Sequence, residues 1–342
     1  MNKLRIGVDL AHKLIQVCSS TNNKVHSNNE MTLQQFSEYL VSLSSSTIIF
    51  EACASANYWH QFATSLGHNS LLISARLVMS VRQSQKTDKN DALAVLQASL
   101  LPDVHFITAK SINEQQAQSM LKLREHSVKQ KVALKNQLTG LLREFNISSG
   151  RSISQFVGTI QDTLEDAENG FCDAFRKMLK VSLDLYLTLT EAIATYDLAL
   201  AKWVDETPSC KKLMRLEGVG ILNAIHLFIN LSSGELARFK AGKDAAACIG
   251  LTPTQHSSGG KLSLGRISRR RNTTLRSLLI TGAMAVIQQV VKREPKTSKE
   301  RWLKALIERR GKKCAAVALA NKTVRTAFSL INNKTEYKAV LL

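Results

Sequence analysis

Four carboxylates lie where an α/β protein could bring them together. Asp9 ends the strand-like segment 4–9, and Glu51 ends the short apolar segment 47–51. In an open α/β sheet, the carboxyl ends of the strands border the ligand crevice. A charge that directly follows buried strand residues is costly unless it has a purpose. Asp9 and Glu51 are therefore candidate ligand-binding residues.

Asp88 and Asp91 stand in the segment KTDKNDA, residues 86–92. Their spacing puts both carboxylates on one face of a starting helix. Taken alone, each of the four acids has a structural alternative, as a turn cap, a helix N-cap or a first-turn acid. As a set they could hold two Mg²⁺ or Mn²⁺ ions through hard oxygen ligands. Two such ions about 3.5–4 Å apart stabilise the attacking and leaving oxygens of a phosphodiester.

A second chemical feature is the Ser- and Gly-rich segment 251–268, which we expect to be a loop. Arg266 and the run Arg269, Arg270 and Arg271 could place a phosphate beside a serine hydroxyl. Serine attack on a phosphodiester would keep the bond energy in a phosphoserine ester, so strands could be exchanged without an external energy source. The alternative is a flexible basic loop with no catalytic role.

Two glycines, Gly218 and Gly220, stand between apolar helical segments in residues 213–224. They predict a tight helix–hairpin–helix turn whose backbone amides could approach phosphate without reading sequence. A plain helix C-cap is the alternative.

Charge is distributed unevenly over the 342 residues. Residues 1–208 hold 20 basic and 20 acidic side chains, and residues 209–342 hold 26 and 7, which accounts for the whole formal charge of +19. Such an imbalance favours a polyanion partner, since counterion release from nucleic acid supplies affinity. The six cysteines form no CxxC pair, and no apolar run approaches the ~20 residues of a membrane span. We therefore expect a soluble, cytoplasmic protein that binds nucleic acid and no membrane.

The chain divides into three predicted parts. Residues 1–110 alternate strand-like and helix-like segments and predict an α/β layer with a largely parallel sheet. Residues 111–207 hold two long helical patterns, 112–145 and 172–204, joined by an irregular loop over 146–170. Residues 208–335 form a basic, mostly helical domain.

The motifs GVD at 7–9, FEA at 50–52 and KTDKNDA at 86–92 resemble the DEDD set of the RuvC-like insertion-sequence transposases. That family includes the Piv DNA invertases and the bridge-RNA-guided recombinases. The segments GLTP at 250–253, Ser258-Gly259 and 311–331 resemble the family's C-terminal domain. By its spacing from GLTP, the family's nucleophile falls on Ser258, with Ser257 and Ser263 as alternatives.

The resemblance implies an RNase H-like (RuvC-like) N-terminal domain, a helical coiled-coil segment for oligomerisation, and a basic C-terminal domain carrying the serine. It implies that Asp9, Glu51, Asp88 and Asp91 bind Mg²⁺ or Mn²⁺. It also implies homodimers or homotetramers in which the carboxylates of one protomer meet the serine of another. The implied partners are double-stranded DNA of the element ends and target and, in many relatives, a structured guide RNA. Lys261 and Arg276, with the arginines and glycines named above, complete the expected nucleic-acid-binding set.

Three alternatives remain at this point. A Piv-like invertase would use the same residues. A non-catalytic nucleic-acid-binding protein derived from a transposase is the second, although the presence of all the candidate catalytic residues argues against it. A sugar-kinase or actin-like ATPase could begin with a similar strand and hairpin, but it would need further Gly-rich loops and would leave the basic domain unexplained.

Overall fold

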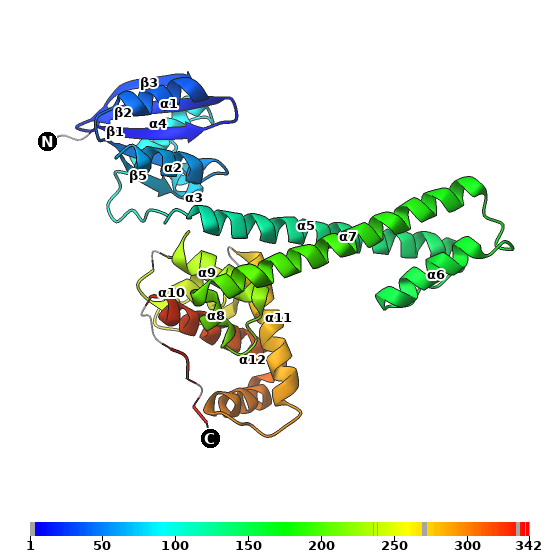
Figure 1. The fold of residues 1–342 in the computed structure, drawn as a ribbon. Coiled ribbons are helices and arrows are strands. Elements are labelled where there is room, and N and C mark those ends of the chain that lie inside the picture. The colour runs from blue at the N-terminus through cyan, green and yellow to red at the C-terminus, as the bar shows by residue number, and fades with distance from the viewer. Residues whose placement is uncertain are drawn as a thin grey trace.

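The computed structural model describes residues 4–234, 236–237, 239–268, 272–332, 336–338 and 340–341. A small sheet-containing unit forms one end of the molecule, two long helices project from its centre, and a helical unit forms the other end (Figure 1). No helix among the described residues has the length and apolar character needed to cross a membrane.

The first unit holds one five-stranded sheet. Its strands are β1 (Arg5–Leu10), β2 (Leu14–Thr21), β3 (Lys24–Thr32), β4 (Thr47–Glu51) and β5 (Asn69–Ile73). The strand order is β3-β2-β1-β4-β5. The pairs β3–β2 and β2–β1 are antiparallel, and the pairs β1–β4 and β4–β5 are parallel. The sheet is therefore mixed, which corrects the expectation of a largely parallel one. Its order is consistent with an RNase H-like unit.

Four helices accompany this sheet: α1 (Leu33–Ser42), α2 (Ala56–Ser65), α3 (Ala75–Val81) and α4 (Asp88–Ala98). Two buried clusters hold the layers together. One centres on Ile6, Phe36 and Phe50, and the other includes Ile49, Ile73 and Val95. Strand β4 contributes Ile49 and Phe50 to different clusters, because successive strand residues point to opposite faces of the sheet.

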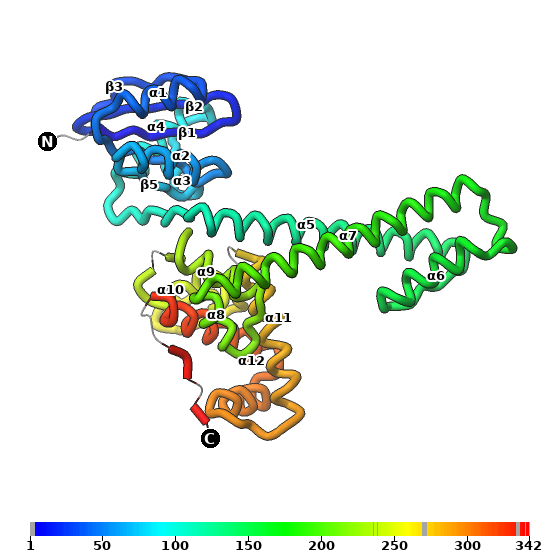
Figure 2. The backbone as a smooth tube through the Cα atoms, in the orientation of Figure 1, coloured from blue at the N-terminus to red at the C-terminus, as the bar shows by residue number. Residues whose placement is uncertain are grey.

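Helices α5 (Ile112–Glu144) and α7 (Asp173–Glu206) pack side by side along the arm seen in Figure 2. Arg124 binds Asp197 across them through two N–O contacts of 2.5 and 3.3 Å. The segment between them contains α6 (Ile153–Glu165), so the expected loop is wrong there. Helix α6 buries Phe156 and Ile160 against both long helices.

Over the residues that the structure describes, the second unit consists of helices and a small hairpin. The helices are α8 (Pro208–Met214), α9 (Ile221–Ser232), α10 (Gly242–Ile249), α11 (Thr273–Val290) and α12 (Ser298–Asn332). Helix α12 bends at Gly311, where φ is 79°. Strands β6 (Pro253–Gln255) and β7 (Leu264–Ile267) pair antiparallel. The expected loop over 251–268 is therefore a β-hairpin.

Direct contacts join the two units near the base of the arm. Thr108 and Gly234 exchange backbone hydrogen bonds of 3.4 and 2.7 Å. Ser232 on α9 donates to the Glu114 carboxylate on α5 at 2.5 Å. The apolar core of the second unit also includes Ala117 of α5 and Trp203 of α7. The N-terminal part of α5 and the C-terminal part of α7 are therefore included in that core.

Candidate active site

Two of the predicted carboxylates lie at adjacent strand ends. Strands β1 and β4 run parallel with Val8 opposite Phe50, and Asp9 and Glu51 each follow one residue later. Both side chains are half-buried. The apolar residues before them fix the strands in the core, so the two acids lie side by side at the carboxyl ends of β1 and β4.

The other two carboxylates come from the first turn of α4. Thr87 caps this helix, its side chain accepting the backbone N–H of Asn90 at 3.3 Å. A helix that starts here has Asp88 and Asp91 in its first turn, where acidic side chains are favoured by the helix dipole. Asp88 is exposed, whereas Asp91 is only 7% exposed.

Gly7 brings α4 close to the sheet. A Cβ at this position would lie 2.6 Å from the carbonyl oxygen of Ala92 and 2.8 Å from the Cβ of Leu96. Both contacts are too short for any side chain larger than hydrogen. The glycine in the GVD motif therefore lets the backbone of β1 touch α4, and this contact sets Asp9 beside the acids of α4.

We expect Gly7→Ala to lower the free energy of unfolding by about 1–3 kcal/mol, the usual cost of forcing an extra carbon into a packed core. The change should be seen as a lower urea midpoint. Gly140→Ala is the matched control, since nothing lies within 4 Å of the added carbon in α5. That helix-interior change should stabilise the protein by up to about 1 kcal/mol. Equal effects of the two substitutions would contradict the close-packing account.

The carboxylates interact electrostatically. Burial raises the pKa of Asp9, and the charges of Asp91 and Asp88 raise it further. Burial likewise raises the pKa of Glu51, followed by the charges of Asp9 and Asp91. Asp9, Asp88 and Asp91 therefore each raise the pKa of at least one other acid of the set. The cluster carries negative charge that its surroundings do not fully balance, and this favours cation binding.

Two cationic side chains partly offset this charge. Arg82, just after α3, binds Asp91 with an N–O distance of 2.8 Å. Lys86 lowers the pKa of both Asp9 and Glu51, although less than the raising effects. Sequence reasoning missed Arg82, because nothing in its spacing from Asp91 marks it as a partner. The contact depends on the conformation of the segment that connects α3 to α4.

The donor set suits a hard divalent ion by its chemistry, since all four groups offer carboxylate oxygens. As the side chains now stand, no group of three or more acidic, histidine or cysteine side chains among the described residues is arranged to hold a metal ion. Asp91 is instead engaged by Arg82. Metal binding at this end of the strands would need rotation of the carboxylates, while the Asp91 oxygen that does not contact Arg82 could still act as a ligand.

Ser258 lies at the turn of the β6–β7 hairpin. Its carbonyl accepts the backbone N–H of Lys261 at 3.1 Å. The intervening Gly259 and Gly260 have φ of 55° and 79°, as a type I′ turn requires. Ser258 is exposed, and its hydroxyl has no hydrogen-bond partner in the part of the chain that the structure describes. It is therefore free to meet a ligand.

The neighbouring serine is held differently. The Ser257 hydroxyl accepts from the Gln255 side chain at 3.0 Å and from the backbone N–H of Ser263 at 3.3 Å. These contacts brace the hairpin. Both serines are exposed, and they differ in that the Ser257 hydroxyl is engaged by these two contacts whereas no described contact engages that of Ser258.

The predicted basic residues fall into three groups. Lys261 and Arg266 are exposed on the hairpin. Arg276 is only 9% exposed, and its guanidinium donates to the Ile249 carbonyl at 3.1 Å, so it braces the end of α10 instead of facing a phosphate. Arg269, Arg270 and Arg271 lie outside the described residues.

The glycine turn before α9 has a packing role. Gly218 has a φ of 78°, and a Cβ there would lie 2.7 Å from the carbonyl oxygen of Gly282 on α11. The need for glycine at 218 follows from this contact, so its residue type says nothing about phosphate binding. Gly220, at the start of α9, is exposed and has open space around it.

The described contacts do not join Ser258 to the carboxylates. Asp9, Glu51, Asp88 and Asp91 belong to the sheet unit, whereas Ser258 belongs to the helical unit at the other end of the molecule. The structure thus brings the four acids together and leaves the serine separate from them.

Comparison with known proteins follows the same division. The model of the DEDD transposases of IS110 matches residues 6–147, which include the four acids. The model described as "Transposase IS116/IS110/IS902 family" matches residues 210–300, which include Ser258.

The transposase for insertion sequence element IS1111A of Coxiella burnetii is 33% identical over 97% of this chain and 91% of the relative. A probable family 20 transposase of Pseudomonas aeruginosa is 33% identical over 99% of both chains. The pilin gene-inverting protein of Moraxella bovis is more distant, at 22% over 76% of this chain and 75% of its own length. These matches place the chain among transposases. It belongs to the IS116/IS110/IS902 family.

Proposed function

We propose that this transposase cuts and rejoins DNA through a covalent phosphoserine intermediate on Ser258. In this proposal Asp9, Glu51, Asp88 and Asp91 bind Mg²⁺ or Mn²⁺ next to the scissile phosphate. The observation that carries the proposal is geometric: Asp9 and Glu51 follow adjacent parallel strands, and Gly7 brings the helix that carries Asp88 and Asp91 against the first of them. The exposed serine on a basic hairpin supplies the second half of the site.

The bound metal would act as a Lewis acid on the phosphate oxygens. The protein's own residues prepare this edge of the sheet. Gly7 holds α4 against β1, and the Thr87 cap fixes the start of the helix. Arg82 pairs with one oxygen of the buried Asp91 and so holds this carboxylate in place.

The chemical step forms one bond and breaks one. The Ser258 oxygen attacks phosphorus and loses its proton, and one phosphorus–oxygen bond of the DNA backbone breaks to leave a protonated sugar hydroxyl. A hydroxyl of the second DNA strand then attacks the phosphoserine. This step joins that strand to the phosphate, breaks the bond to the serine and returns its proton. The number of phosphate esters is unchanged, so the reaction needs no external energy source.

We further propose that each site combines the carboxylates of one protomer with the serine of another. The separation of the two halves within one chain supports this arrangement. So does an exposed apolar stripe on α7, where Met178, Val181 and Leu185 are 70%, 68% and 52% exposed. Apolar residues at this three- and four-residue spacing favour packing against a second helix, which suits a homodimer or homotetramer.

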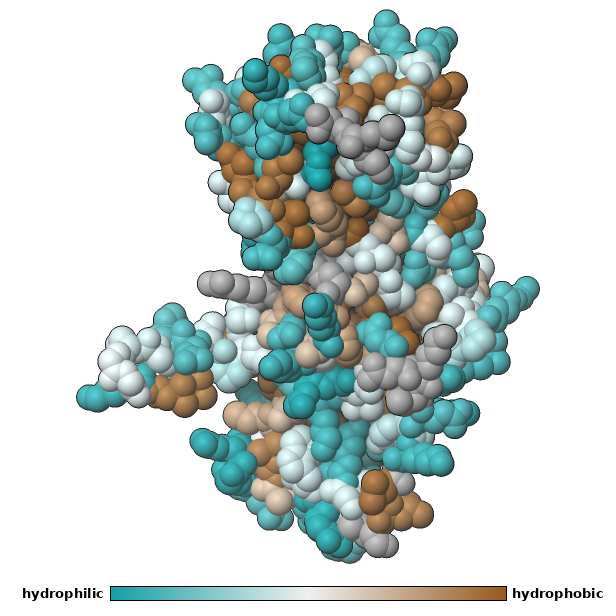
Figure 3. Space-filling view, turned by 90° about the vertical axis from the view of Figure 1, so that its left-hand side faces the viewer, coloured by the Kyte–Doolittle hydropathy of each residue, from teal (hydrophilic) through white to brown (hydrophobic). Residues whose placement is uncertain are grey.

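The proposed partners are the DNA of the element ends and target, together with a structured guide RNA. Hydrophilic side chains cover much of the lower half of the face in Figure 3, where the C-terminal helices lie. Lys261, Arg266 and the exposed Gly220 are the described residues we assign to backbone contact. Such contacts position nucleic acid without reading its sequence.

A DNA invertase is the second candidate function, and the similarity to the pilin gene-inverting protein favours it. An invertase and a transposase would share the same covalent step and differ in the DNA that they join. The products of strand exchange separate the two, since inversion keeps the segment in place and transposition moves it.

Covalent trapping tests the proposal. Full-length protein is mixed with element-junction DNA and flank-encoded RNA in Mg²⁺, and the mixture is run on a denaturing gel. We expect a protein–DNA adduct in Mg²⁺ and none in EDTA. Strand cleavage without any adduct would indicate a water-using nuclease and contradict the serine mechanism.

A further inference from the structure

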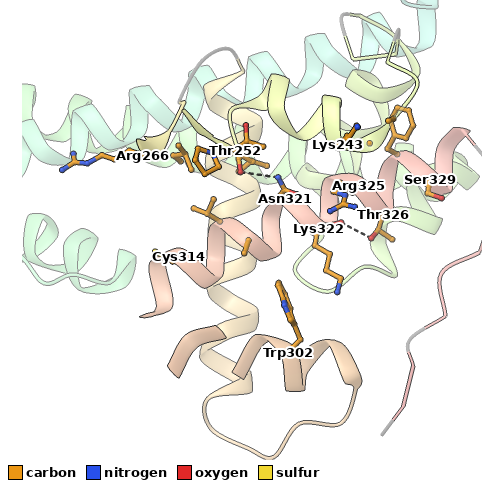
Figure 4. Close-up of a pocket in the computed structure, with 18 of the residues that line it drawn as sticks. Lys243, Thr252, Arg266, Trp302, Cys314, Asn321, Lys322, Arg325, Thr326 and Ser329 are labelled. Carbon is orange, nitrogen blue, oxygen red and sulfur yellow. Dashed lines mark hydrogen bonds between the residues drawn. The ribbon is translucent and has the colours of Figure 1, made fainter. Parts of the chain in front are cut away.

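A hollow of the helical unit lies beside the serine hairpin and was not predicted from the sequence. It has a volume of about 1460 Å³. Its walls come from the start of α10, from β6 and β7, and from both parts of α12 on either side of the bend (Figure 4). We call it the α10–α12 groove.

Positive charge dominates the α10–α12 groove. Its lining includes six basic residues and, among the described residues, no acidic one. The six are Lys240, Lys243, Arg266, Lys313, Lys322 and Arg325. All six are exposed, and none forms an ion pair within the described part of the chain. These like charges repel one another unless an occupant supplies regularly spaced negative charge.

The α10–α12 groove is held in shape by contacts within the protein. Gly242 lets α10 approach α12 closely, since a Cβ there would lie 3.0 Å from the Cα of Arg325. Asn321 donates to the Leu251 carbonyl at 3.4 Å and ties α12 to the chain leading into β6. Lys322 extends beside the Trp302 ring, with its nitrogen 4.6 Å from the ring centre. The backbone segments that carry the cations are therefore held together by packing.

The hairpin connects this groove with Ser258. Pro253 on β6 and Gly265, Arg266 and Ile267 on β7 line the groove, and the same two strands end in the turn that carries Ser258. A polyanionic strand in the groove would therefore run along the hairpin that presents the serine.

We propose that the α10–α12 groove binds the sugar–phosphate backbone of the DNA strand that is presented to Ser258. The choice of DNA rests on the proposed function, since the serine on the groove wall is assigned to attack DNA. The groove itself is inferred from its charge and shape. It adds Lys240, Lys243, Lys313, Lys322 and Arg325 to the residues predicted from the sequence.

Cys314 offers a local probe, because it is exposed and lines the groove. The test uses the full chain carrying Ser258→Ala in EDTA, so that no chemistry takes place. A random-sequence DNA duplex is added, and iodoacetamide labelling of each cysteine is followed by peptide mass spectrometry. We expect DNA to slow labelling of Cys314 several-fold. Cys172, exposed at the start of α7, should react at an unchanged rate.

Affinity measured against salt concentration supplies the second readout. The triple variant Lys243→Gln, Lys322→Gln, Arg325→Gln should reduce the slope of log affinity against log salt by about 2 to 3, since each phosphate contact contributes about 0.9. The control triple Lys24→Gln, Lys122→Gln, Lys292→Gln removes the same charge from exposed side chains outside the groove. Its slope should stay close to that of the parent.

The possible outcomes separate this inference from the proposed function. DNA binding with unprotected Cys314 and equal slopes for both triples would overturn the groove assignment alone. Protection of Cys314 by RNA of the same sequence, but not by DNA, would overturn the assignment to DNA. Failure of the parent protein to bind DNA at all would contradict the proposed function itself.

Discussion

Replacing Asp9 by asparagine is expected to lower the rate of DNA strand cleavage by at least about 10³-fold, while making the metal-free protein more stable. The rate loss follows because metal-held phosphate activation is worth several kcal/mol, and about 1.4 kcal/mol corresponds to tenfold in rate. The gain in stability follows because Asp9 is half-buried beside two other acids that raise its pKa.

The raised pKa of Asp9 determines how the stability difference between the two proteins changes with pH. In the folded protein the pKa of Asp9 is raised above its ordinary 3.8, so the folded state binds more protons than the unfolded state just above pH 3.8. Stability therefore falls as pH rises through the raised pKa. The advantage of asparagine should be largest at neutral pH in EDTA and should shrink as the pH falls through the raised pKa towards 3.8.

Melting temperatures of the two proteins in EDTA at several pH values measure the stability effect, and cleavage in Mg²⁺ measures the rate. Asp162→Asn is the control, since this acid is exposed on α6, away from the cluster. An asparagine variant that was less stable than the parent at neutral pH would contradict the charge repulsion inferred among the four acids.

Replacing Ser258 by alanine is expected to abolish the covalent adduct and to lower strand exchange by at least about 10³-fold, as loss of a nucleophile does. Its effect on stability should be small, because the side chain is exposed and makes no hydrogen bond within the described residues. The variant should thus melt like the parent.

Ser257→Ala is the matched control one residue away. It removes the hydroxyl that accepts from Gln255 and from the Ser263 backbone, so it should loosen the hairpin and cost about 1 kcal/mol or less at this exposed site. Activity should fall far less than in Ser258→Ala. A reversed order of the two effects would move the nucleophile to Ser257.

The four acids could be predicted because their signals are local. Asp9 and Glu51 follow apolar strand residues directly, and Asp88 and Asp91 share one helical turn. Their partners are set by tertiary contacts instead. Arg82 reaches Asp91 through the turn between α3 and α4, and Gly7 contacts α4 across the layers. No sequence spacing encodes either contact.

The errors in the predicted fold also have physical causes. Strand β3 carries little signal in the sequence, because its residues KVHSNNEMT are mostly polar, which suits its place as an edge strand of the sheet. Helix α6 did carry a signal, since the Ser152–Gln155 capping box precedes Phe156 and Ile160 at helical spacing. The hairpin over 253–267 was signalled by Gly259-Gly260, a pair typical of type I′ turns.

The α10–α12 groove lay beyond sequence reasoning for another reason. Its basic residues come from segments between 240 and 325, and only the bend at Gly311 and the approach of α10 to α12 bring them together. The excess charge of the C-terminal part was visible from the composition. Its concentration around one hollow became visible only in the folded chain.

The central claim is that carboxylates and serine from different protomers form one site, and mixing two inactive variants tests it most directly. Asp9→Asn and Ser258→Ala proteins are each assayed for the covalent adduct, alone and after co-assembly, with Asp162→Asn mixed with Ser257→Ala as the active control. The account predicts no adduct from either variant alone and an adduct in the mixture, attached to the Asp9→Asn protomer that retains Ser258. A mixture that stays inactive while the control pair forms the adduct would contradict the shared site.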